Sequence, residues 1–309
     1  MRILVTGGAG FIGSHVVDQY IAAGHQVAVV DNLSTGRRIN LNPRAVFYEV
    51  DIRSAELDTI FEKEKPDLVN HHAGHLDVFN SIENPMEDAS INILGSINLF
   101  TVALRHNVRN VIYISCGEAV IGEPVYLPCD ENHPVKPLNP YGASKHAVEH
   151  YLHLLHTNFG LEFVILRYPH VYGPRQNPGG MDGVVAIFAG KMLQNQPITI
   201  YGDGKQERDF VYVEDCVQAN LLALNCPNPN TVYHLGSGHG TSINDIFTNL
   251  KKLTGYRGGA VHGPESVGET RRIYLNPDKA RKELGWSLKT PLKEGLEHTI
   301  AFMKEHEPL

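Results

Sequence analysis

The segment that most constrains the fold is the N-terminal run ILVTGGAGFIGSH, residues 3–15. It joins a short β-branched apolar run to a helical pattern through Gly7, Gly10 and Gly13. In such a strand–turn–helix unit, the first glycine permits the tight turn, the second lets backbone approach a pyrophosphate, and the third allows close helix–strand packing. The pyrophosphate lies on the helix N-terminus, where free N–H groups and the helix dipole favour anions. We therefore predict a dinucleotide site at the start of an α/β sheet.

The first half of the chain alternates apolar runs with longer amphipathic stretches. Strands are expected at Arg2–Thr6, Gln26–Asp31, Val46–Val50, Leu68–His71, Val111–Ser115 and Phe163–Arg167. Helices are expected at Gly13–Ala23, Ala55–Lys63, Met86–His106 and Tyr141–Phe159. Strand–helix alternation with nearly continuous apolar strands predicts a doubly wound parallel sheet, a Rossmann fold, covered on both faces. Dinucleotides bind that fold at the carboxyl ends of the strands.

The pattern changes after about Arg167, where Gly, Pro and Asn become frequent. We expect residues 1–168 to form the dinucleotide-binding domain and residues 169–309 a smaller, interleaved substrate domain. The chain is expected to rejoin the first domain at about 205–235. Later elements are expected at Ile198–Tyr201 (strand) and at Ile243–Thr254, Pro277–Leu284 and Leu292–Lys304 (helices).

Asp31 indicates which dinucleotide binds. It ends the predicted second strand, 18 residues beyond Gly13, where a carboxylate accepts hydrogen bonds from a ribose 2′-hydroxyl. A 2′-phosphate would be repelled by the same charge. The sequence therefore predicts NAD rather than NADP.

Tyr141 and Lys145 are four residues apart in YGASK, so on a helix they share one face. An ammonium near a phenol favours the phenolate and lowers the tyrosine pKa toward working pH. Such a pair also arises by chance on exposed helices, but beside a dinucleotide loop it indicates acid–base chemistry on a hydroxyl.

Composition excludes several other classes of protein. A hydrophobic content of 42% and a charged content of 20% over 309 residues are those of a globular protein. The net charge of −7 argues against a nucleic-acid partner. The four cysteines (Cys116, Cys129, Cys216 and Cys226) show no C-x-x-C spacing, and we expect them to be reduced. Because the chain has neither a signal-peptide pattern nor an 18-residue apolar run, we expect a cytoplasmic location and no membrane partner.

Longer motifs make a family resemblance specific. The chain resembles the extended short-chain dehydrogenase/reductases and, within them, the UDP-glucose (UDP-galactose) 4-epimerases. The resemblance covers nearly the whole length and runs through TGGAGFIGSH, VVDNLSTG, Asp51-Ile52, Asn92-x-x-Gly95, NPYGASK, VYGPRQNP, GVVAIF, YGDGKQERDFVYVEDC and the ELGW segment. It implies an NAD-dependent 4-epimerase acting on a UDP-sugar. It also implies a homodimer formed through the two long helices, packed as a four-helix bundle.

The resemblance, together with the glycine loop, gives the expected site. The cofactor-binding residues are Gly7, Gly10, Phe11, Ile12, Gly13, Asp31, Asn32, Asp51, Ile52, Ala73, Asn92, Ser115, Tyr141 and Lys145. Asp51 and Ile52 are expected to flank the adenine, and Ala73 and Asn92 to line the cofactor channel. The substrate-binding residues are His170, Val184, Tyr201, Arg208 and Arg271. Arg208 is expected on the diphosphate, since a guanidinium suits bidentate phosphate contact, whereas Arg271 is as consistent with a solvated surface charge.

The implied mechanism uses Tyr141 as a phenolate that takes the proton from the sugar 4-hydroxyl while hydride leaves C4 for NAD⁺. Lys145 lowers the tyrosine pKa and bonds the nicotinamide ribose. The 4-keto sugar turns over, and hydride returns to its other face, so that NAD is regenerated in each cycle.

The chain departs from the family pattern in the loop after the fifth strand. Residues 115–122 read SCGEAVIG, with Cys116 where a Ser or Thr is expected to bridge the tyrosine and the sugar oxygen. Ile121 stands where a tyrosine is usual. We expect Cys116 to take the catalytic position of that hydroxyl. A thiol is a weaker hydrogen-bond donor than a hydroxyl, so the proton relay through Cys116 is expected to be weaker.

Two further departures also fall around the sugar. His170 stands where an asparagine that contacts the diphosphate is usual, and Gly74 and His75 stand where Ala and Gln are usual. These changes leave NAD binding secure and leave the identity of the hexose open among glucose/galactose, an N-acetylhexosamine and a hexuronate.

Two histidine groups are candidates for metal binding but are better explained otherwise. The residues are His71, His72 and His75, and His146, His150 and His153. His146 and His150 have i, i+4 spacing, yet Ala147 follows where a zinc protease has glutamate. We expect no metal, with the first group lining the cleft and the second lying on the dimer surface.

Two rival functions share this fold. A sugar-nucleotide 4,6-dehydratase needs a glutamate base in the loop after the fifth strand, but Ala119 stands there, with Glu118 beside it. A non-catalytic NAD-sensing protein would have no need for Tyr141 and Lys145, although the altered Cys116 loop is compatible with it.

Overall fold

The computed structural model describes residues 1–179, 183–265 and 270–306. Its central sheet has seven strands in the order β11-β6-β5-β4-β1-β2-β3, and every pairing is parallel. The bounds are β1 Arg2–Thr6, β2 Gln26–Val30, β3 Val46–Tyr48, β4 Leu68–His71, β5 Asn110–Cys116, β6 Glu162–Tyr168 and β11 Thr231–His234. The six predicted strands are confirmed to within two residues at each end, and so is the doubly wound fold.

The seventh strand, β11, was not predicted from the sequence. It contains only four residues, but it pairs with β6 from Val164 to Arg167 and so extends the sheet at one edge. The run Thr231–His234 lies outside the strand–helix alternation that marks the other strands, and its pairing with β6 identifies it as a strand.

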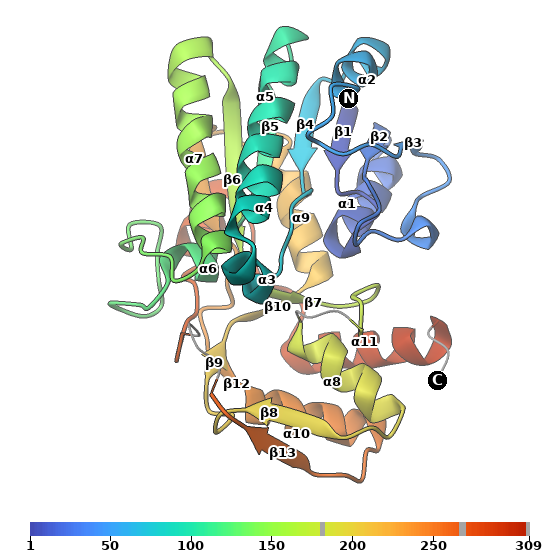
Figure 1. Cartoon of the computed structure of the whole chain (residues 1–309), viewed down its shortest axis with the longest axis vertical. Coiled ribbons are helices and arrows are strands. Elements are labelled where there is room, and N and C mark those ends of the chain that lie inside the picture. Colours follow the sequence, from blue (N-terminus) through green and yellow to red (C-terminus); the bar gives the residue numbers. More distant parts are fainter. Residues whose placement is uncertain (180–182, 266–269, 307–309) are drawn as a thin grey trace.

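Helices cover both faces of the sheet (Figure 1). One face carries α1 (Phe11–Ala22) and α9 (Val213–Ala223), which contact each other. The other carries α2 (Leu57–Glu64), α5 (Gly95–Arg105) and α7 (Pro140–Phe159). The helix predicted at Met86–His106 consists of α4 (Pro85–Ala89), a π-type segment η2 (Ser90–Leu94) and α5. A short helix, α3 (Val78–Glu83), precedes it.

The remaining elements form a smaller lobe beyond the carboxyl ends of the sheet strands (Figure 1). This lobe contains α8 (Val184–Leu193), β8 (Ile198–Tyr201), α10 (Ile243–Thr254), β13 (Ala260–Gly263) and α11 (Leu292–His306). Short pairs join it to the sheet: β7 (His170–Tyr172) with β10 (Phe210–Tyr212), and β9 (Glu207–Arg208) with β12 (Thr241–Ser242). A second π-type segment is η3 (Ala280–Leu284), and one short helix, α6 (Gly117–Ile121), follows β5.

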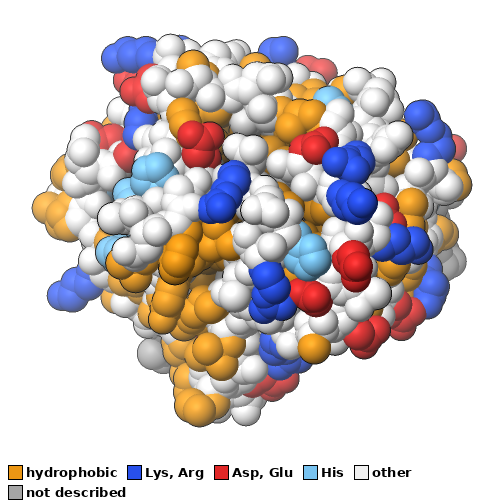
Figure 2. All heavy atoms as spheres, turned by 90° about the horizontal axis from the view of Figure 1, so that it is seen from above, with side chains coloured by type: hydrophobic (Ala, Val, Ile, Leu, Met, Phe, Trp, Pro, Cys, Tyr) orange, Lys and Arg blue, Asp and Glu red, His pale blue; other side chains and the backbone are white. Residues whose placement is uncertain are grey.

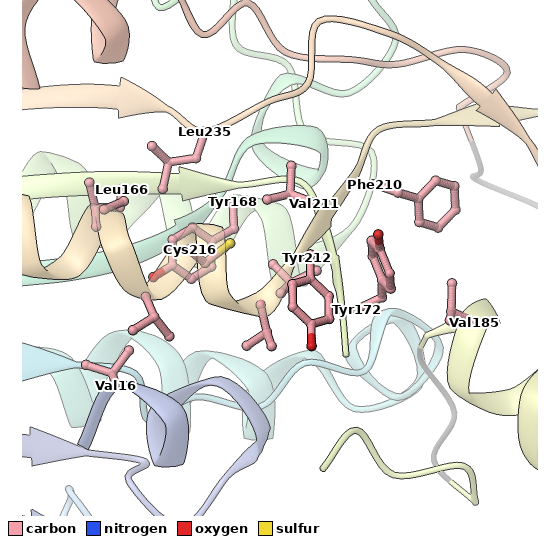
Figure 3. Close-up of a cluster of buried hydrophobic side chains, with 14 of the residues drawn as sticks. Val16, Leu166, Tyr168, Tyr172, Val185, Phe210, Val211, Tyr212, Cys216 and Leu235 are labelled. Carbon is pink, nitrogen blue, oxygen red and sulfur yellow. The ribbon is translucent and has the colours of Figure 1, made fainter. Parts of the chain in front are cut away.

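One hydrophobic core runs from the sheet into the smaller lobe (Figure 3). It begins at Val16 on α1, passes Tyr168 and Cys216, and reaches Tyr172 and Tyr212, whose ring centroids are 5.7 Å apart. Because buried aromatic rings contribute much of the energy of a core, the two lobes pack as one body at this point.

Seen from the amino ends of the strands, the molecule shows basic and acidic side chains interspersed (Figure 2). Hydrophobic side chains gather toward the lower left of that view. In the described residues, none of the helices combines the length and the apolar character needed to cross a bilayer.

Candidate active site

A cavity of about 860 Å³ lies at the carboxyl ends of the strands, between the sheet and the smaller lobe. Most of the residues predicted for the site line it. They are Gly7, Gly10, Phe11, Ile12, Gly13, Asp31, Asn32, Asp51, Ile52, Ala73, Ser115, Cys116, Tyr141, Lys145, His170 and Arg208.

The glycine loop is shaped by contacts that admit no side chain. Gly7 has φ +70°, and a Cβ there would lie 2.7 Å from the backbone nitrogen of Ala73. A Cβ at Gly13 would lie 2.2 Å from the carbonyl oxygen of Gly7. Helix α1 begins at Gly10 without a side-chain cap, so its N–H groups are available to a pyrophosphate. These residues fit a dinucleotide cofactor.

Asp31 follows β2 directly and ties that strand to the glycine loop. Its carboxylate accepts hydrogen bonds from the backbone N–H of Ala9 at 3.0 Å and of Leu33 at 2.8 Å. Burial raises the pKa of Asp31, and these two bonds oppose that rise. Asp31 lines the cavity, and its contact with the ribose remains a prediction.

Asp51 and Asn32 form a second group on the same side of the cavity. The Asn32 amide donates to Asp51 at 2.9 Å, and Arg53 holds the same carboxylate. The hydrogen bonds from Arg53 hold the pKa of Asp51 at about 2, although its partial burial opposes them. Asp51 is therefore a fixed negative charge beside Ile52.

Asn92 occupies a different position from the one predicted. It is 2% exposed, and its amide accepts from the His75 N–H at 2.8 Å and donates to the His75 carbonyl at 3.1 Å. It therefore supports the loop after β4 from behind. A Cβ at the neighbouring Gly74 would lie 2.9 Å from the Asn92 side-chain oxygen, so a glycine at this position leaves room for the hydrogen bonds between Asn92 and His75.

Tyr141 and Lys145 lie in the first turns of α7, each 6% exposed. The helix is fixed at its start by Asn139, whose side chain accepts from the Gly142 N–H at 2.9 Å. The Lys145 ammonium lies 4.4 Å from the centroid of the Tyr113 ring. Burial lowers the pKa of Lys145 to about 8, and nearby negative charges oppose that fall.

Sequence reasoning missed those negative charges. They belong to Asp88, which accepts from Ser144 and from Asn92, and to Glu149, one turn beyond Lys145. A carboxylate four residues beyond a catalytic lysine was the available signal for Glu149, but Asp88 comes from another helix and gave none.

Glu149 is 4% exposed and links the site to the sheet. It accepts from Ser115 at 2.7 Å and from Arg167 at 2.9 Å. Burial by itself would raise the pKa of Glu149, but the hydrogen bonds from Arg167, His146 and Ser115 hold it at about 2.

Cys116 is the last residue of β5 and lies at the cavity wall. Burial, followed by the charge of Glu118, raises the pKa of its thiol to about 11, so the thiol is protonated near neutral pH. Glu118 itself lines the cavity, contacts the imidazole Nδ1 of His170 and accepts from the Asp209 N–H at 3.2 Å. Both Glu118 and His170 stood out in the sequence, but their contact was not predicted from it.

The remaining predicted substrate residues differ in their position relative to the cavity. Arg208 is 8% exposed and lines the cavity, while Val184 begins α8 next to Gly183, which also lines it. Tyr201 is 56% exposed at the end of β8. Arg271 makes a bidentate, exposed ion pair with Asp203, with both distances 2.8 Å.

Several members of the two histidine groups have defined hydrogen-bond partners. His71 is buried between Thr6 and Ser96, at 2.7 and 2.9 Å, and burial lowers the pKa of His72 to about 3. His146 contacts Glu149 at 3.1 Å and His150 at 3.0 Å. His75 lines the cavity, as expected for a cleft residue.

Comparisons with known proteins agree with this geometry. The profile of the NAD dependent epimerase/dehydratase family matches residues 3–236. The putative UDP-glucose 4-epimerase of Methanocaldococcus jannaschii is 47% identical over 304 residues, covering 98% of this chain and 99% of the relative.

Two solved structures have nearly the same fold. The UDP-glucose 4-epimerase of Thermotoga maritima, crystallised with UDP-glucose, is 44% identical with a TM-score of 0.97, and 99% of each chain is covered. That of Thermus thermophilus, in complex with NAD, is 39% identical with a TM-score of 0.95, covering 99% of this chain and 100% of the other. With the glycine cradle, Asp31 and the Tyr141–Lys145 pair at one cavity, the chain belongs to the NAD dependent epimerase/dehydratase family.

Proposed function

We propose that the protein interconverts the two C4 epimers of a UDP-sugar, of the UDP-glucose/UDP-galactose type, through a 4-keto sugar. The observation that carries the proposal is the placement of Tyr141 and Lys145, buried at the wall of the cavity that also holds the glycine cradle. The named activity of the relatives in M. jannaschii and T. maritima supports it.

In this proposal Tyr141 holds and returns the proton of the sugar 4-hydroxyl. NAD⁺, held at the glycine loop, would supply the acceptor for the hydride of C4 and the donor that restores it. Lys145 keeps a positive charge beside Tyr141 and thereby favours the phenolate. Cys116 takes the position of the hydroxyl that relays the proton, as a neutral donor.

Arg208 is the proposed cation for the substrate diphosphate, since it lines the cavity and is nearly buried. The sheet lobe, residues 1–168 with about 205–235, would hold NAD, and residues 169–309 would hold the UDP-sugar. A direct role of Asn92 toward NAD is replaced in this scheme by its support of the loop after β4.

The test is product analysis by NMR with a panel of UDP-sugars. We expect an equilibrium mixture of two C4 epimers, and we expect Tyr141→Phe to lower kcat by roughly 10²–10⁴-fold while NAD stays bound. A 4-keto-6-deoxy product would indicate a dehydratase instead. Bound NAD that no UDP-sugar reduces, with no product, would indicate a sensor. Activity of Tyr141→Phe within a few-fold of wild type would assign the proton to another group.

We also infer a homodimer through α5 and α7. The apolar side chains Leu94, just before α5, and Leu154, on α7, are 61% and 55% exposed, which favours a covered face. Light scattering of the wild type and of a Leu154→Glu variant tests this, and a wild-type monomer would refute it.

The four free thiols suit a reducing compartment, and we place the enzyme in the cytoplasm.

A further inference from the structure

We propose that the carboxylate of Glu118 faces the sugar ring of the substrate and selects a neutral hexose over a hexuronate. This inference rests on the proposed function, because it takes Tyr141 as the group that contacts the sugar 4-hydroxyl. It assigns a role to a residue that neither the glycine loop nor the Tyr141–Lys145 pair uses.

Two contacts with other segments of the chain fix the position of Glu118. Its short helix, α6, packs directly on the first turn of α7, because a Cβ at Gly142 would lie 2.1 Å from the carbonyl oxygen of Ala119. The Glu118 carboxylate in turn accepts from the N–H of Asp209 at 3.2 Å. Glu118 therefore lies between the turn that carries Tyr141 and the strand that carries Arg208.

The hexose must occupy the same interval. Its 4-hydroxyl reaches Tyr141, and the diphosphate on its anomeric carbon extends toward Arg208. Tyr141, Glu118 and Arg208 all line the one cavity. The charge of Glu118 also contributes to the raised pKa of the Cys116 thiol, which places it close to the expected proton relay.

The hydrogen bonds of Glu118 leave it able to accept from a sugar. It is 7% exposed, one oxygen accepts from Asp209 and the other contacts His170 Nδ1. A carboxylate has about four acceptor sites, so the two oxygens can each accept another hydrogen bond. A hydroxymethyl group at C5 can donate such a bond, whereas an ionised carboxylate at C5 cannot.

Charge adds to this preference. The C5 substituent of the hexose lies next to C4, and therefore close to Tyr141 and to the Glu118 turn. The imidazole of His170, on β7, contacts the Glu118 carboxylate from the other side. Lys145 and Arg208, two cations that line this part of the cavity, are engaged by Tyr141 and the diphosphate in the proposed reaction. A hexuronate would thus bring a second carboxylate against a buried one, which is strongly unfavourable.

The experiment compares kcat/KM for UDP-glucose and UDP-glucuronate in the wild type and in Glu118→Gln. The amide keeps the shape and accepts from Asp209, but it has no charge. We expect the wild type to prefer UDP-glucose by about 100-fold or more, and the variant to narrow that ratio by about tenfold. Glu123→Gln, which removes an exposed carboxylate from the same segment, is the matched control and should leave the ratio unchanged.

The outcomes separate this inference from the proposed function. A wild type that epimerises no UDP-sugar in the panel refutes the proposed function. Two outcomes refute the role of Glu118 but leave the proposed function standing. One is a wild type that uses both sugars equally, and the other is a folded, NAD-bound Glu118→Gln protein whose kcat/KM ratio equals that of the wild type. If Glu118→Gln does not fold, Glu118→Ala, which removes the same charge, takes its place, and a ratio in that variant equal to the wild-type ratio refutes the inference.

Discussion

Lys145 is placed for chemistry at a cost in stability, and Lys145→Met should reveal that cost. The ammonium is buried, and its pKa falls from the ordinary value of 10.5 to about 8. Each pH unit of such a fall corresponds to about 1.4 kcal/mol, so keeping the charge in the folded protein costs about 3 kcal/mol at neutral pH. Methionine has a similar length, carries no charge and can pack on the Tyr113 ring.

The sign of the pH dependence follows from which state holds the proton. Below about pH 8, Lys145 is charged in both the folded and the unfolded chain, and the full cost applies. Between about pH 8 and 10.5 the unfolded chain still holds the proton that the folded protein has released, so the wild type gains stability relative to the variant as pH rises. The advantage of Lys145→Met should therefore fall from about 3 kcal/mol at about pH 7 to about 1 kcal/mol at about pH 9.5.

Urea unfolding of both proteins, freed of nucleotide, measures this difference at the two pH values. Lys252→Met, at an exposed position of α10, is the control and should change the free energy of unfolding by no more than about 0.5 kcal/mol at either pH. The same Lys145→Met protein should have lost epimerase activity. A Lys145→Met protein that is no more stable than wild type at about pH 7, or whose advantage does not change with pH, would refute the reasoning.

Three further predictions concern the cofactor loop and the proton relay. Gly13→Ala should abolish NAD binding and lower the melting temperature, because the added Cβ would lie 2.2 Å from the Gly7 carbonyl oxygen. NAD titration and thermal unfolding check this. Gly259→Ala is the control and should have no effect, because a Cβ at Gly259 meets nothing within 4 Å. Apo protein should bind NAD⁺ more tightly than NADP⁺ because Asp31 would face the 2′-phosphate, and equal affinities in parallel titrations would contradict this. Cys116→Ser should keep or raise 4-epimerase activity, since a hydroxyl is the better donor and acceptor; loss of most activity, with NAD still bound, would show that the thiol itself is required.

The parts of this protein that depend on local geometry can be predicted from short stretches of its sequence. The strand, glycine turn and helix of residues 2–22 are encoded within one stretch of chain, and each glycine is required by contacts within that unit or with the adjacent strand. The same holds for Tyr141 and Lys145, whose shared face follows from helix periodicity alone. Six of the seven sheet strands were also readable, because they belong to the strand–helix alternation of residues 1–168.

The contacts between these parts, by contrast, depend on how the whole chain folds. Glu118 and His170 are 52 residues apart in the sequence and meet because α6 follows β5, β7 follows β6, and β5 and β6 are neighbours in the sheet. Asn92 has the sequence context of a cofactor residue, yet its amide is committed to the His75 backbone. Arg271 and Arg208 look alike as cations, but one pairs with Asp203 in solvent and the other lines the cavity. A side chain's partner depends on which segments the fold brings together, and for contacts this distant in the chain no local pattern carries that information.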